Sequence, residues 1–434
     1  FIAAPFIHAV GGSWVCPKAD IAAGNFEKIT ELCKQARSAA LGFEVAHIGV
    51  NCEDAAAASA VCEKLNEAFD LPVKDGKAEN IDLDAVKQMV DLFLERGFTY
   101  FDTSYVYHNG ASETAIREAL VKRHERCSFL LASKFPTFIL PAEEQVDTIF
   151  QEQLDKCGVA YFDYYLLHNL NRYLYDTEVK TAQLFDHMKK WKEEGRIRHI
   201  AFSYHDDAAN LDRILTEHPE VEAVQIALNY YDWEEPFMQA KACYEVIRKH
   251  GAQVIVMEPV KGGMLAKAPE ETTGRMQAGS PASYAIRYAA SLDGVLAVLS
   301  GMSDLSQVED NTSYMQDMKP LTEEERELLQ DAKAAYCKQW KFNCADFSAL
   351  DQNAAGVPIS GAIRAYNSLL LQPNPYFGAE LNYYKSFRSA YDRAFETADY
   401  AEQTKAIGGA FDVNAAMKEA VEFLTKNNFQ SYMD

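Results

Sequence analysis

The chain reads DAVKQMVDLFLER from residue 84 to 96 and GFTYFDTSYVYHNG from residue 97 to 110. In the first stretch apolar residues recur at helical spacing, as at Val86, Val90 and Phe93, and Gly97 is a typical helix stop. The second stretch begins with a short apolar run that predicts a strand over 98–104, followed by a polar loop. The two stretches together predict an amphipathic helix followed directly by a buried strand.

The same alternation continues along the chain. We expect strands at 98–104, 129–134, 161–168, 197–203, 222–229, 254–259 and 295–300. Helical patterns lie between them, near 112–123, 143–157, 178–194, 208–217, 235–250 and 281–291. Short apolar strands separated by amphipathic helices predict a parallel sheet, and this many repeats predict an α/β fold of the (β/α)8 TIM barrel type. Only seven strands follow residue 80, so the eighth must come from elsewhere in the chain.

Four chemically active side chains lie at or just past the ends of predicted strands, namely Asp102, Tyr107, Lys134 and His168. The C-terminal ends of the strands of a parallel barrel meet on one face, so residues distant in sequence can come together there. Taken singly, each residue has an ordinary explanation: a packing tyrosine, a solvated lysine or histidine, and an aspartate that caps a turn. Four of them in order, at matching strand ends, favour a catalytic site.

The order and spacing of these residues resemble the catalytic tetrad of the aldo-keto reductases, and the resemblance covers about residues 80–320. It implies NAD(P)H-dependent reduction of an aldehyde, ketone or sugar-derived carbonyl, or the reverse oxidation, without a metal ion. Hydride transfer leaves negative charge on the carbonyl oxygen, which then needs a proton donor and polar neighbours. The implied roles are Tyr107 as general acid, Lys134 as its electrostatic activator, Asp102 as the anchor of the lysine, and His168 as the group that orients the carbonyl.

The resemblance extends to residues that would hold a nicotinamide cofactor. Ser203 and Gln225 match the ligands of the nicotinamide carboxamide, whereas Tyr204 stands where the family usually has Asn. Met257 stands where many members stack a Tyr on the nicotinamide, and a thioether can also cover a flat ring. The following loop would approach the pyrophosphate with its backbone amides. The loop residues concerned are Pro259, Val260, Gly262, Gly263 and Leu265.

The segment 299–311 resembles the family's last strand and the helix start that grips the adenosine. The residues expected to contact the cofactor there are Ser300, Gly301, Met302, Gln307, Asp310 and Asn311. NADP-dependent members usually carry Lys or Arg just after this strand, whereas this loop has Ser303, Asp304 and Ser306. Asp304 would repel a 2′-phosphate and could accept a hydrogen bond from a ribose hydroxyl. We therefore favour NAD and keep NADP open, because a basic residue could come from another loop.

Residues 321–434 are expected to form a polar, helical C-terminal extension that packs over the barrel mouth. The pattern MEPVKGG at 257–263 is closest to the aldo-keto reductase branch whose extension is ferredoxin-like and holds an iron–sulfur cluster. In this chain the extension has Cys337 and Cys344 and no other cysteine, and the usual cluster needs four thiolates. We therefore expect an extension without an iron–sulfur cluster.

Residues 1–75 precede the barrel, which we assign to residues 76–320. They resemble the tail of certain bacterial 2-keto-3-deoxy-6-phosphogluconate aldolases, in which residues 11–13 (Gly-Gly-Ser) would match part of a phosphate site. A plain turn is the other interpretation of these three residues. The Schiff-base lysine of those aldolases lies upstream of the matching segment, so nothing supports aldolase activity. The usual first strand of a reductase is missing here, so either residues 45–50 supply the eighth strand or the chain is an unusual fusion.

Composition limits the class of partner. The 434 residues include 42 Lys and Arg against 64 Asp and Glu, which gives a net charge of −22. This acidity argues against nucleic acid and anionic membranes as partners. No apolar stretch reaches the ~18 residues of a membrane helix, and nine cysteines without a visible secretion signal favour reduced thiols in the cytoplasm. We expect a small-molecule carbonyl substrate, and the sequence does not determine the oligomeric state.

Two other functions compete with a carbonyl reductase. The first is a catalytically quiet subunit that binds the cofactor as a sensor or regulator. Tyr204, Met257 and the missing first strand favour it, while the complete tetrad argues against it. The second is a sugar-phosphate-binding fusion that uses the N-terminal segment around Ser13. Turnover of aldehydes with NADH and NADPH separates an enzyme from the quiet subunit.

Overall fold

The computed structural model describes Lys28 and residues 81–139, 143–353, 356–373, 380–381 and 399–426. The chain divides into two compact units, Phe1–Asn80 and Ile81–Asp434, and the fold below is that of the second unit. The strand predicted at 45–50 and the phosphate site predicted at 11–13 lie outside the described residues.

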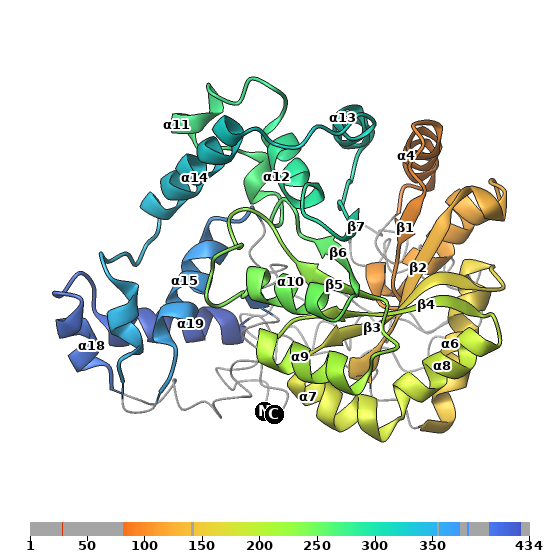
Figure 1. Ribbon diagram of the computed structural model, residues 1–434, viewed down its shortest axis with the longest axis horizontal. Helices are drawn as coiled ribbons and strands as arrows, with labels where there is room; N and C mark the ends of the chain where they lie inside the picture. Colours follow the sequence, from red (N-terminus) through yellow and green to blue (C-terminus); the bar gives the residue numbers. More distant parts are fainter. Residues whose placement is uncertain are drawn as a thin grey trace. The chain divides into compact units, whose positions relative to one another are not determined.

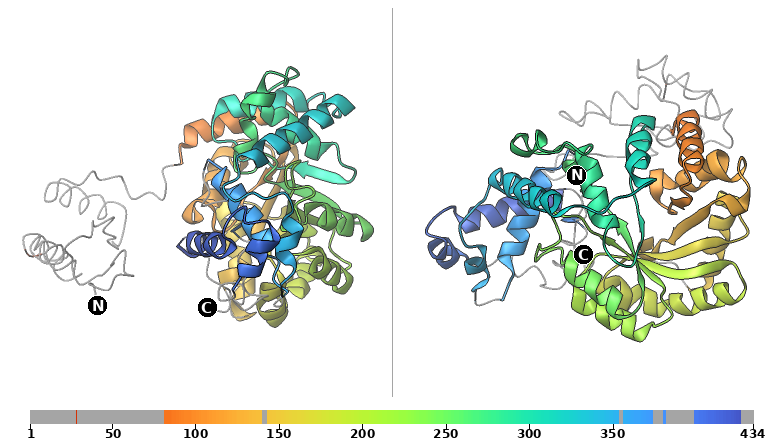
Figure 2. Two further views of the ribbon diagram at one scale, coloured as in Figure 1. Left: turned by 90° about the vertical axis from the view of Figure 1, so that its left-hand side faces the viewer. Right: turned by 45° about the horizontal axis from the view of Figure 1, so that its top comes forward.

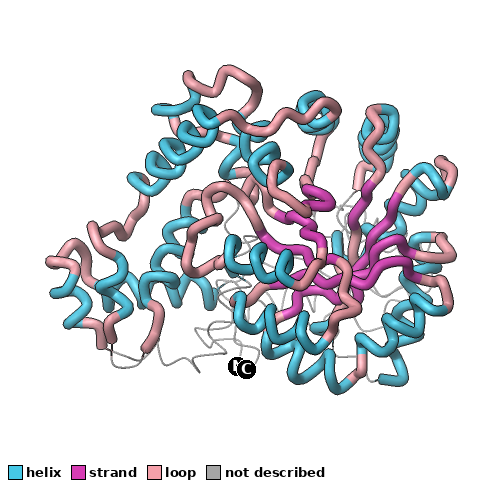
Figure 3. Tube along the Cα trace, in the orientation of Figure 1, coloured by secondary structure: helices cyan, strands magenta, loops and turns pink. Residues whose placement is uncertain are grey.

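Seven strands form one parallel sheet in chain order (Figures 1 and 3). They are β1 (Tyr100–Asp102), β2 (Leu130–Phe135), β3 (Phe162–Leu170), β4 (Ile197–Tyr204), β5 (Ala223–Ala227), β6 (Gln253–Met257) and β7 (Val295–Val298). Each coincides with one strand predicted from the sequence, so these seven predictions are confirmed. When parallel strands lie side by side in chain order, every connection between them crosses the same face of the sheet with the same hand. Repeated connections of this kind curl the sheet into a barrel.

Helices lie around the outside of this sheet (Figure 3). They are α4 (Leu83–Glu95), α5 (Ser112–Ile116), α6 (Glu143–Cys157), α7 (Arg172–Leu174), α8 (Leu184–Glu193), α9 (Ala208–Glu217), α10 (Ala240–Lys249), α12 (Pro281–Ala290) and α13 (Leu305–Met315). The short helix α11 (Glu270–Thr273) packs instead against α14 (Glu323–Lys338). Helix α4 shows how the sequence determines where a helix begins and ends. Asp82 caps α4 by accepting hydrogen bonds from the backbone N–H groups of Asp84 and Ala85, and Gly97, with φ 86°, follows its end.

Apolar residues form two cores, one on each face of the sheet. The outer core lies between strands and helices, and Phe150 of α6 stacks there on Trp191 of α8 with ring centroids 3.9 Å apart. The inner core fills the barrel with Ala132, Tyr164, Leu166, Ala201, Ala223 and Ile255. Side chains alternate between the two faces along a strand. Positions two residues after an inner-core residue on the same strand therefore also face the interior.

The two edges of the sheet are linked through α4, which precedes β1, and α13, which follows β7. Arg96, at the end of α4, donates hydrogen bonds to Glu309 O at 2.7 Å and to Thr312 Oγ1 at 2.8 Å. Gln316 Nε2 donates in return to Arg96 O at 3.1 Å. A helix before the first strand contacts the helix after the last one only if the sheet is curled. The predicted barrel fold is therefore confirmed over its seven described strands.

The described part of the C-terminal extension is helical, as predicted. Its helices are α14 (Glu323–Lys338), α15 (Ile359–Leu370), α18 (Ala401–Ala406) and α19 (Val413–Lys426). Figures 1 and 2 show them gathered on one side of the barrel. Among them, α15 and α19 contribute to a separate apolar cluster, which includes Ile363, Leu369 and Met417. Nowhere in the described ranges does a helix have both the length and the apolar character of a membrane span.

Two predicted helices differ from the structure. The pattern at 178–194 is interrupted: its first residues belong to the π-helix Tyr175–Val179, and α8 begins after Gln183, which has a left-handed φ of 50°. The pattern at 235–250 begins later, as α10, after Gln239, which has a φ of 49°. In the second case Pro236 disfavours a helical conformation in the residue before it. That residue, Glu235, accepts two hydrogen bonds of 2.8 Å from Arg364 of α15. A contact with the extension thus replaces the first turn of the predicted helix.

We expect Arg96→Ala to lower the free energy of unfolding by about 1–2 kcal/mol, because two acceptors on α13 lose a charged donor. Urea denaturation followed by circular dichroism measures this change. Arg275→Ala is the matched control, since Arg275 pairs with Asp331 at the surface, with both side chains more than half exposed. Its effect should stay below about 0.5 kcal/mol. Equal losses in the two variants would mean that the contact between α4 and α13 does not stabilise the barrel.

Candidate active site

Six of the predicted site residues lie on the inner face of the barrel at the C-terminal ends of the strands. Several residues of the inner core lie two positions before a predicted site residue. Side chains two positions apart on a strand point to the same face, so these site residues also face the barrel interior. The residues placed in this way are Lys134, His168, Ser203, Gln225 and Met257. Asp102 stands in the same relation to Tyr100, which packs against the inner core.

Lys134 is the centre of the cluster. Its side chain is 1% exposed, and its Nζ donates to Asp102 Oδ1, to Thr103 O at 3.0 Å and to Tyr107 Oη at 3.4 Å. An ammonium has three N–H groups, so each one has an acceptor. Tyr107 opens the short turn Tyr107–Gly110 and keeps 38% of its surface exposed. The phenol is therefore the member of this group that a bound molecule can reach.

Burial and pairing together set the charges. Burial alone would lower the pKa of Lys134, but the charge of Asp102, the phenol of Tyr107 and their hydrogen bonds raise this pKa above its usual value. Burial raises the pKa of Asp102, and the ammonium of Lys134 opposes that rise. Lys134 is therefore an ammonium at neutral pH, and its charge faces the phenol oxygen.

His168 completes the group. Its Nδ1 lies 3.0 Å from Ser104 Oγ, and its ring meets the ring of Tyr107 edge to face with centroids 5.7 Å apart. Burial, followed by the nearby charges of Lys134 and His205, lowers the pKa of His168 well below its usual value. The imidazole is therefore neutral at pH 7. If Ser104 donates to Nδ1, the ring carries its proton on Nε2 and can donate it to a ligand.

The sequence analysis missed the groups that support this cluster from behind. Gln153 Nε2 donates to Lys134 O at 3.1 Å and to Glu113 Oε1 at 2.7 Å, and Ser133 Oγ donates to the same carboxylate oxygen at 2.6 Å. Burial raises the pKa of Glu113. Ser104 lies within the strand-end segment that pointed to Asp102, so its position was a usable signal. Glu113 offered no such signal, because a glutamate on a helix is normally solvated.

Ser203 and Gln225 lie opposite each other on β4 and β5 and are almost fully buried. Ser203 Oγ accepts a hydrogen bond from Asn169 N at 2.7 Å, while Gln225 Oε1 has no hydrogen-bond partner among the described residues. A buried acceptor without a partner is unfavourable, so this oxygen is suited to an N–H donor of a ligand. Tyr204 faces the helices, where its hydroxyl donates to Asp207 O at 2.7 Å. It therefore does not reach the interior, where the family's Asn would act.

The loop after β6 makes a tight turn at its two glycines. Gly262 and Gly263 have φ values of 59° and 89°, a region that side chains disfavour. Val260 O accepts hydrogen bonds from Gly263 N at 3.1 Å and Leu265 N at 3.0 Å. Pro259 and Leu265 are buried, so the loop offers mainly its backbone to a ligand.

The predicted adenosine-binding residues lie between β7 and α13. The loop contains Ser300, Gly301 and Met302, and the helix contributes Gln307 and Asn311, which lie on one helical face at a spacing of four. Asn311 Nδ2 donates to Ser300 Oγ at 3.0 Å, which ties the loop to the helix. These predicted residues are thus brought together.

Asp304 caps the start of α13. It accepts hydrogen bonds from Ser306 Oγ at 2.6 Å and from Gln307 N at 3.0 Å, and these two donors lower the pKa of Asp304. A full negative charge therefore stands at the helix start. Asp310 has a different partner, since it accepts a hydrogen bond from Ser280 Oγ at 2.6 Å.

Comparison with known proteins identifies relatives of the barrel. Residues 73–278 match the sequence model of the Aldo/keto reductase family. The chain is 27% identical over 195 residues to probable aldo-keto reductase 1 of Glycine max, which covers 43% of this chain and 48% of that protein. It is 21% identical over 276 residues to the uncharacterized oxidoreductase YqkF of Bacillus subtilis, which covers 56% of this chain and 85% of that protein. The chain thus spans about half the length of the first relative and most of the second.

Two solved structures also align with the barrel. An aldo-keto reductase of Bacillus halodurans in its holo form has a TM-score of 0.48 and 23% identity, over 59% of this chain and 89% of that chain. An aldo-keto reductase of Klebsiella pneumoniae in complex with NADPH has a TM-score of 0.48 and 20% identity, over 57% of this chain and 85% of that chain.

The protein is an α/β barrel whose polar cluster stands at the C-terminal ends of the strands, where barrel enzymes have their active sites. Residues 73–278 match the Aldo/keto reductase family, so this segment is similar to that family. The resemblance to this family that the sequence predicted is therefore confirmed over residues 73–278.

We expect the protein to lose stability as the pH falls from about 6.5 to 4. Burial lowers the pKa of His205 to about 4, and the pKa of His168 is also lowered, whereas an unfolded histidine has a pKa of about 6.5. Between the folded and unfolded pKa values, the unfolded chain binds more protons than the folded chain. Each of these histidines therefore lowers the free energy of unfolding by about 1.4 kcal/mol for every unit by which the pH falls. Above pH 7.5 this contribution is constant.

Urea denaturation at pH 7.5, 6 and 5 tests this expectation on the wild type and on His205→Gln. The variant lacks one of the two buried imidazoles, so its stability should fall less steeply with decreasing pH. An identical slope in the two proteins would contradict the assignment of His205 as a buried neutral histidine.

Proposed function

We propose that this protein catalyses the NAD(P)H-dependent reduction of a small aldehyde, ketone or sugar-derived carbonyl, and the reverse oxidation of the alcohol. The observation that carries the proposal is the placement of Tyr107. Its Oη lies 3.4 Å from a buried ammonium that is itself paired with Asp102, and its ring contacts His168. The match of residues 73–278 to the Aldo/keto reductase family supports the same reaction.

The inner face and the neighbouring loops fit a nicotinamide dinucleotide. The unpartnered Gln225 Oε1 and the adjacent Ser203 suit the two ends of a carboxamide group. Gly262 is exposed in this turn, so its backbone can approach a pyrophosphate. The residues proposed for the adenosine are Ser300, Gly301, Met302, Gln307 and Asn311. When bound, the reduced cofactor supplies the hydride to the carbonyl carbon.

Tyr107 is proposed to donate its phenolic proton to the carbonyl oxygen as that oxygen becomes negative. The ammonium of Lys134 stabilises the phenolate that remains, because it is held close to the phenol in a site of low dielectric constant. The phenol is 38% exposed, so water can return the proton after turnover.

His168 and Asp102 are proposed to set the geometry of this step. A neutral imidazole can donate a hydrogen bond to the carbonyl oxygen and hold it beside Tyr107. Asp102 keeps Lys134 charged and in place through their direct pair. Phe138 lies against His168 with ring centroids 5.4 Å apart, and the next residue, Ile139, is 48% exposed. This apolar surface suits the carbon skeleton next to the carbonyl group.

We expect Tyr107→Phe to reduce kcat for aldehyde reduction by a factor between about 10² and 10⁴, the usual contribution of general acid catalysis. Steady-state rates with NADH and NADPH over a panel of aldehydes measure it. The dissociation constants of the cofactors should not change, because the phenol faces the substrate.

Tyr105→Phe is the matched control, since Tyr105 lies in the same segment but its hydroxyl donates to Glu152 at 3.3 Å. This variant should keep its activity. Unchanged rates in Tyr107→Phe would remove the catalytic assignment. A wild type that binds cofactor but turns over none of the aldehydes would favour the regulatory subunit instead.

We propose NAD as the preferred cofactor, because the charge of Asp304 stands at the start of α13, in the segment proposed to bind the adenosine, and would repel a 2′-phosphate. Asp304→Asn removes this charge but keeps a good N-cap side chain. Relief of a repulsion of about 1 kcal/mol should tighten NADPH binding about fivefold and leave NADH binding unchanged.

Titration of cofactor fluorescence measures both affinities. Asp317→Asn is the control, because Asp317 is an exposed carboxylate beyond the end of α13. A wild type that prefers NADPH, or an Asp304→Asn variant with an unchanged ratio of affinities, would contradict the proposed preference.

A further inference from the structure

A buried cluster of three charged side chains joins the C-terminal extension to the loop after β6. Lys261 of that loop is 0% exposed, and its Nζ donates to Asp232 Oδ1 at 2.8 Å, to Asp232 Oδ2 at 2.7 Å and to Glu380 Oε1. Asp232 follows β5 and is 2% exposed, while Glu380 belongs to the extension and is 1% exposed. Neither the catalytic group nor the predicted cofactor ligands include these three residues.

Other polar groups satisfy the two carboxylates. Asn229 Nδ2 donates to Asp232 Oδ2 at 2.8 Å. On the other side, Ser368 Oγ donates to Glu380 Oε1 at 2.8 Å and Gln372 Nε2 donates to Glu380 Oε2 at 2.9 Å. A buried ion pair with this many hydrogen bonds is strongly disrupted when one partner is removed, because the remaining charge is left buried without compensation.

The loop that carries Lys261 has an unfavourable backbone conformation. Glu258 and Lys261 have φ values of 54° and 50°, in the left-handed region that residues other than glycine disfavour. The next two residues are the glycines proposed for the pyrophosphate. Strained backbone of this kind persists where the surrounding structure holds it, and it is concentrated at ligand-binding sites.

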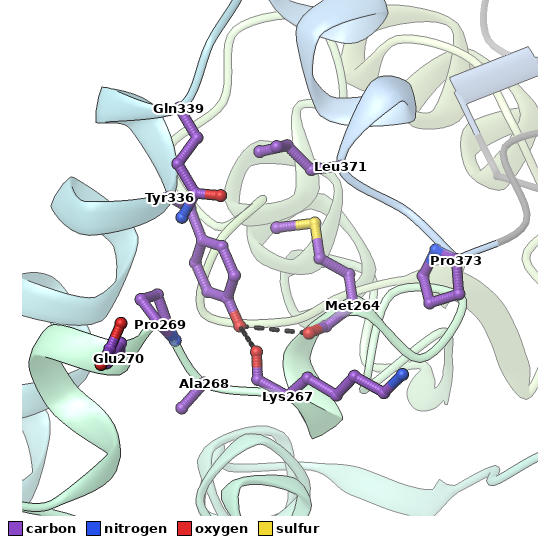
Figure 4. Close-up of a pocket in the computed structure, with 9 residues that line it drawn as sticks. All are labelled: Met264, Lys267, Ala268, Pro269, Glu270, Tyr336, Gln339, Leu371 and Pro373. Carbon is purple, nitrogen blue, oxygen red and sulfur yellow. Dashed lines mark hydrogen bonds between the residues drawn. The ribbon is translucent and has the colours of Figure 1, made fainter.

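The extension contacts this loop at two further points. A Cβ atom on Gly262 would lie 2.9 Å from Gln372 Oε1, so the extension packs directly against the glycine backbone. On α14, Tyr336 Oη lies 3.1 Å from Met264 O and 2.8 Å from Lys267 O (Figure 4). The same tyrosine lines a cavity of about 390 Å³ between the loop and the extension. The extension therefore contacts the loop from Lys261 to Lys267.

The geometry points to a positioning role for the extension: Glu380, acting through Lys261, holds the loop 258–265 in the conformation that binds the cofactor pyrophosphate. This inference rests on the proposed nicotinamide-dependent function. Asp232 takes part from the barrel side. Charge is maintained in the cluster because Asp232 and Glu380 raise the pKa of Lys261 above its usual value, although burial alone would lower it.

The inference has a quantitative consequence. If only a fraction of the molecules keeps the binding conformation, the apparent dissociation constant rises by the inverse of that fraction, so a population of one tenth weakens binding about tenfold. Chemistry on the bound complex is not affected, because Glu380 contacts none of the catalytic residues described above. The loss should therefore appear in KM for the cofactor and not in kcat.

The test uses Glu380→Gln in the full chain, with NADH and NADPH titrated by fluorescence and assayed at steady state. We expect both the dissociation constant and KM of the cofactor to rise about tenfold or more, with kcat at saturating cofactor within about twofold of wild type. Glu419→Gln is the matched control, because Glu419 lies in the same extension but pairs with the half-exposed Lys341. It should leave both cofactor constants unchanged.

A lower melting temperature of Glu380→Gln with cofactor constants within about twofold of wild type would overturn the inference, since the cluster would then serve stability alone. Failure of the wild type to bind either cofactor would instead overturn the proposed function, and this inference with it.

Hydrogen exchange on the unmodified chain gives a second test that does not depend on the folding of a variant. Binding and conformation are reciprocally linked, so saturating NADH should slow amide exchange in residues 359–372 as well as in the loop 258–265. Residues 359–372 include Ser368 and Gln372, which hold Glu380. Slower exchange in the loop with unchanged exchange in 359–372 would overturn the inference.

Discussion

The buried ammonium of Lys134 is the interaction on which the candidate site depends. A charge removed from water must find hydrogen bonds and a counter-charge within the protein. Lys134 finds them in the carboxylate of Asp102, the carbonyl of Thr103 and the phenol of Tyr107. Because these acceptors come from the end of β1 and the loop after it, their positions relative to β2 cannot vary independently. The need to satisfy one ammonium thus fixes the distance between phenol and lysine that the proposed chemistry requires.

Lys261 is a second buried ammonium, and it has a similar role on the cofactor side. Its carboxylate partners come from the loop after β5 and from the C-terminal extension. Both lysines also lie near an aromatic ring, 4.8 Å from the centroid of Tyr107 for Lys134 and 5.3 Å from that of Tyr231 for Lys261. One ammonium organises the groups proposed for proton transfer, and the other organises the loop proposed for the pyrophosphate. If the proposed loop binds the pyrophosphate, the extension is part of the cofactor site.

Much of the fold could be predicted because it depends on local patterns. The apolar runs located all seven described strands, and the amphipathic helix before β1 was correct to within one residue at each end. The predicted start of α10 was wrong. Pro236 is a local reason for the later start, whereas the hydrogen bond of Glu235 with Arg364 of the extension is one that the local pattern cannot reveal. For the site, strand ends indicated which residues lie near the barrel mouth. Only the alternation of side chains along each strand decided that Tyr204 faces the helices and that Gln225 faces the interior. The catalytic and cofactor roles of these residues stay predictions.

By itself, the sequence determined the barrel class, the order of its strands and the set of polar residues at their ends. It could do so because strand and helix periods are properties of neighbouring residues. Only the tertiary structure decided which lysines lose contact with water and what pairs with them. In the sequence Lys261 resembles any other lysine of the chain, and Lys134 is distinguished only by its position at the end of a predicted strand. Their burial depends on residues far along the chain, as between Lys261 and Glu380, which are 119 positions apart. Electrostatic pairing acts through space, and no local pattern records it.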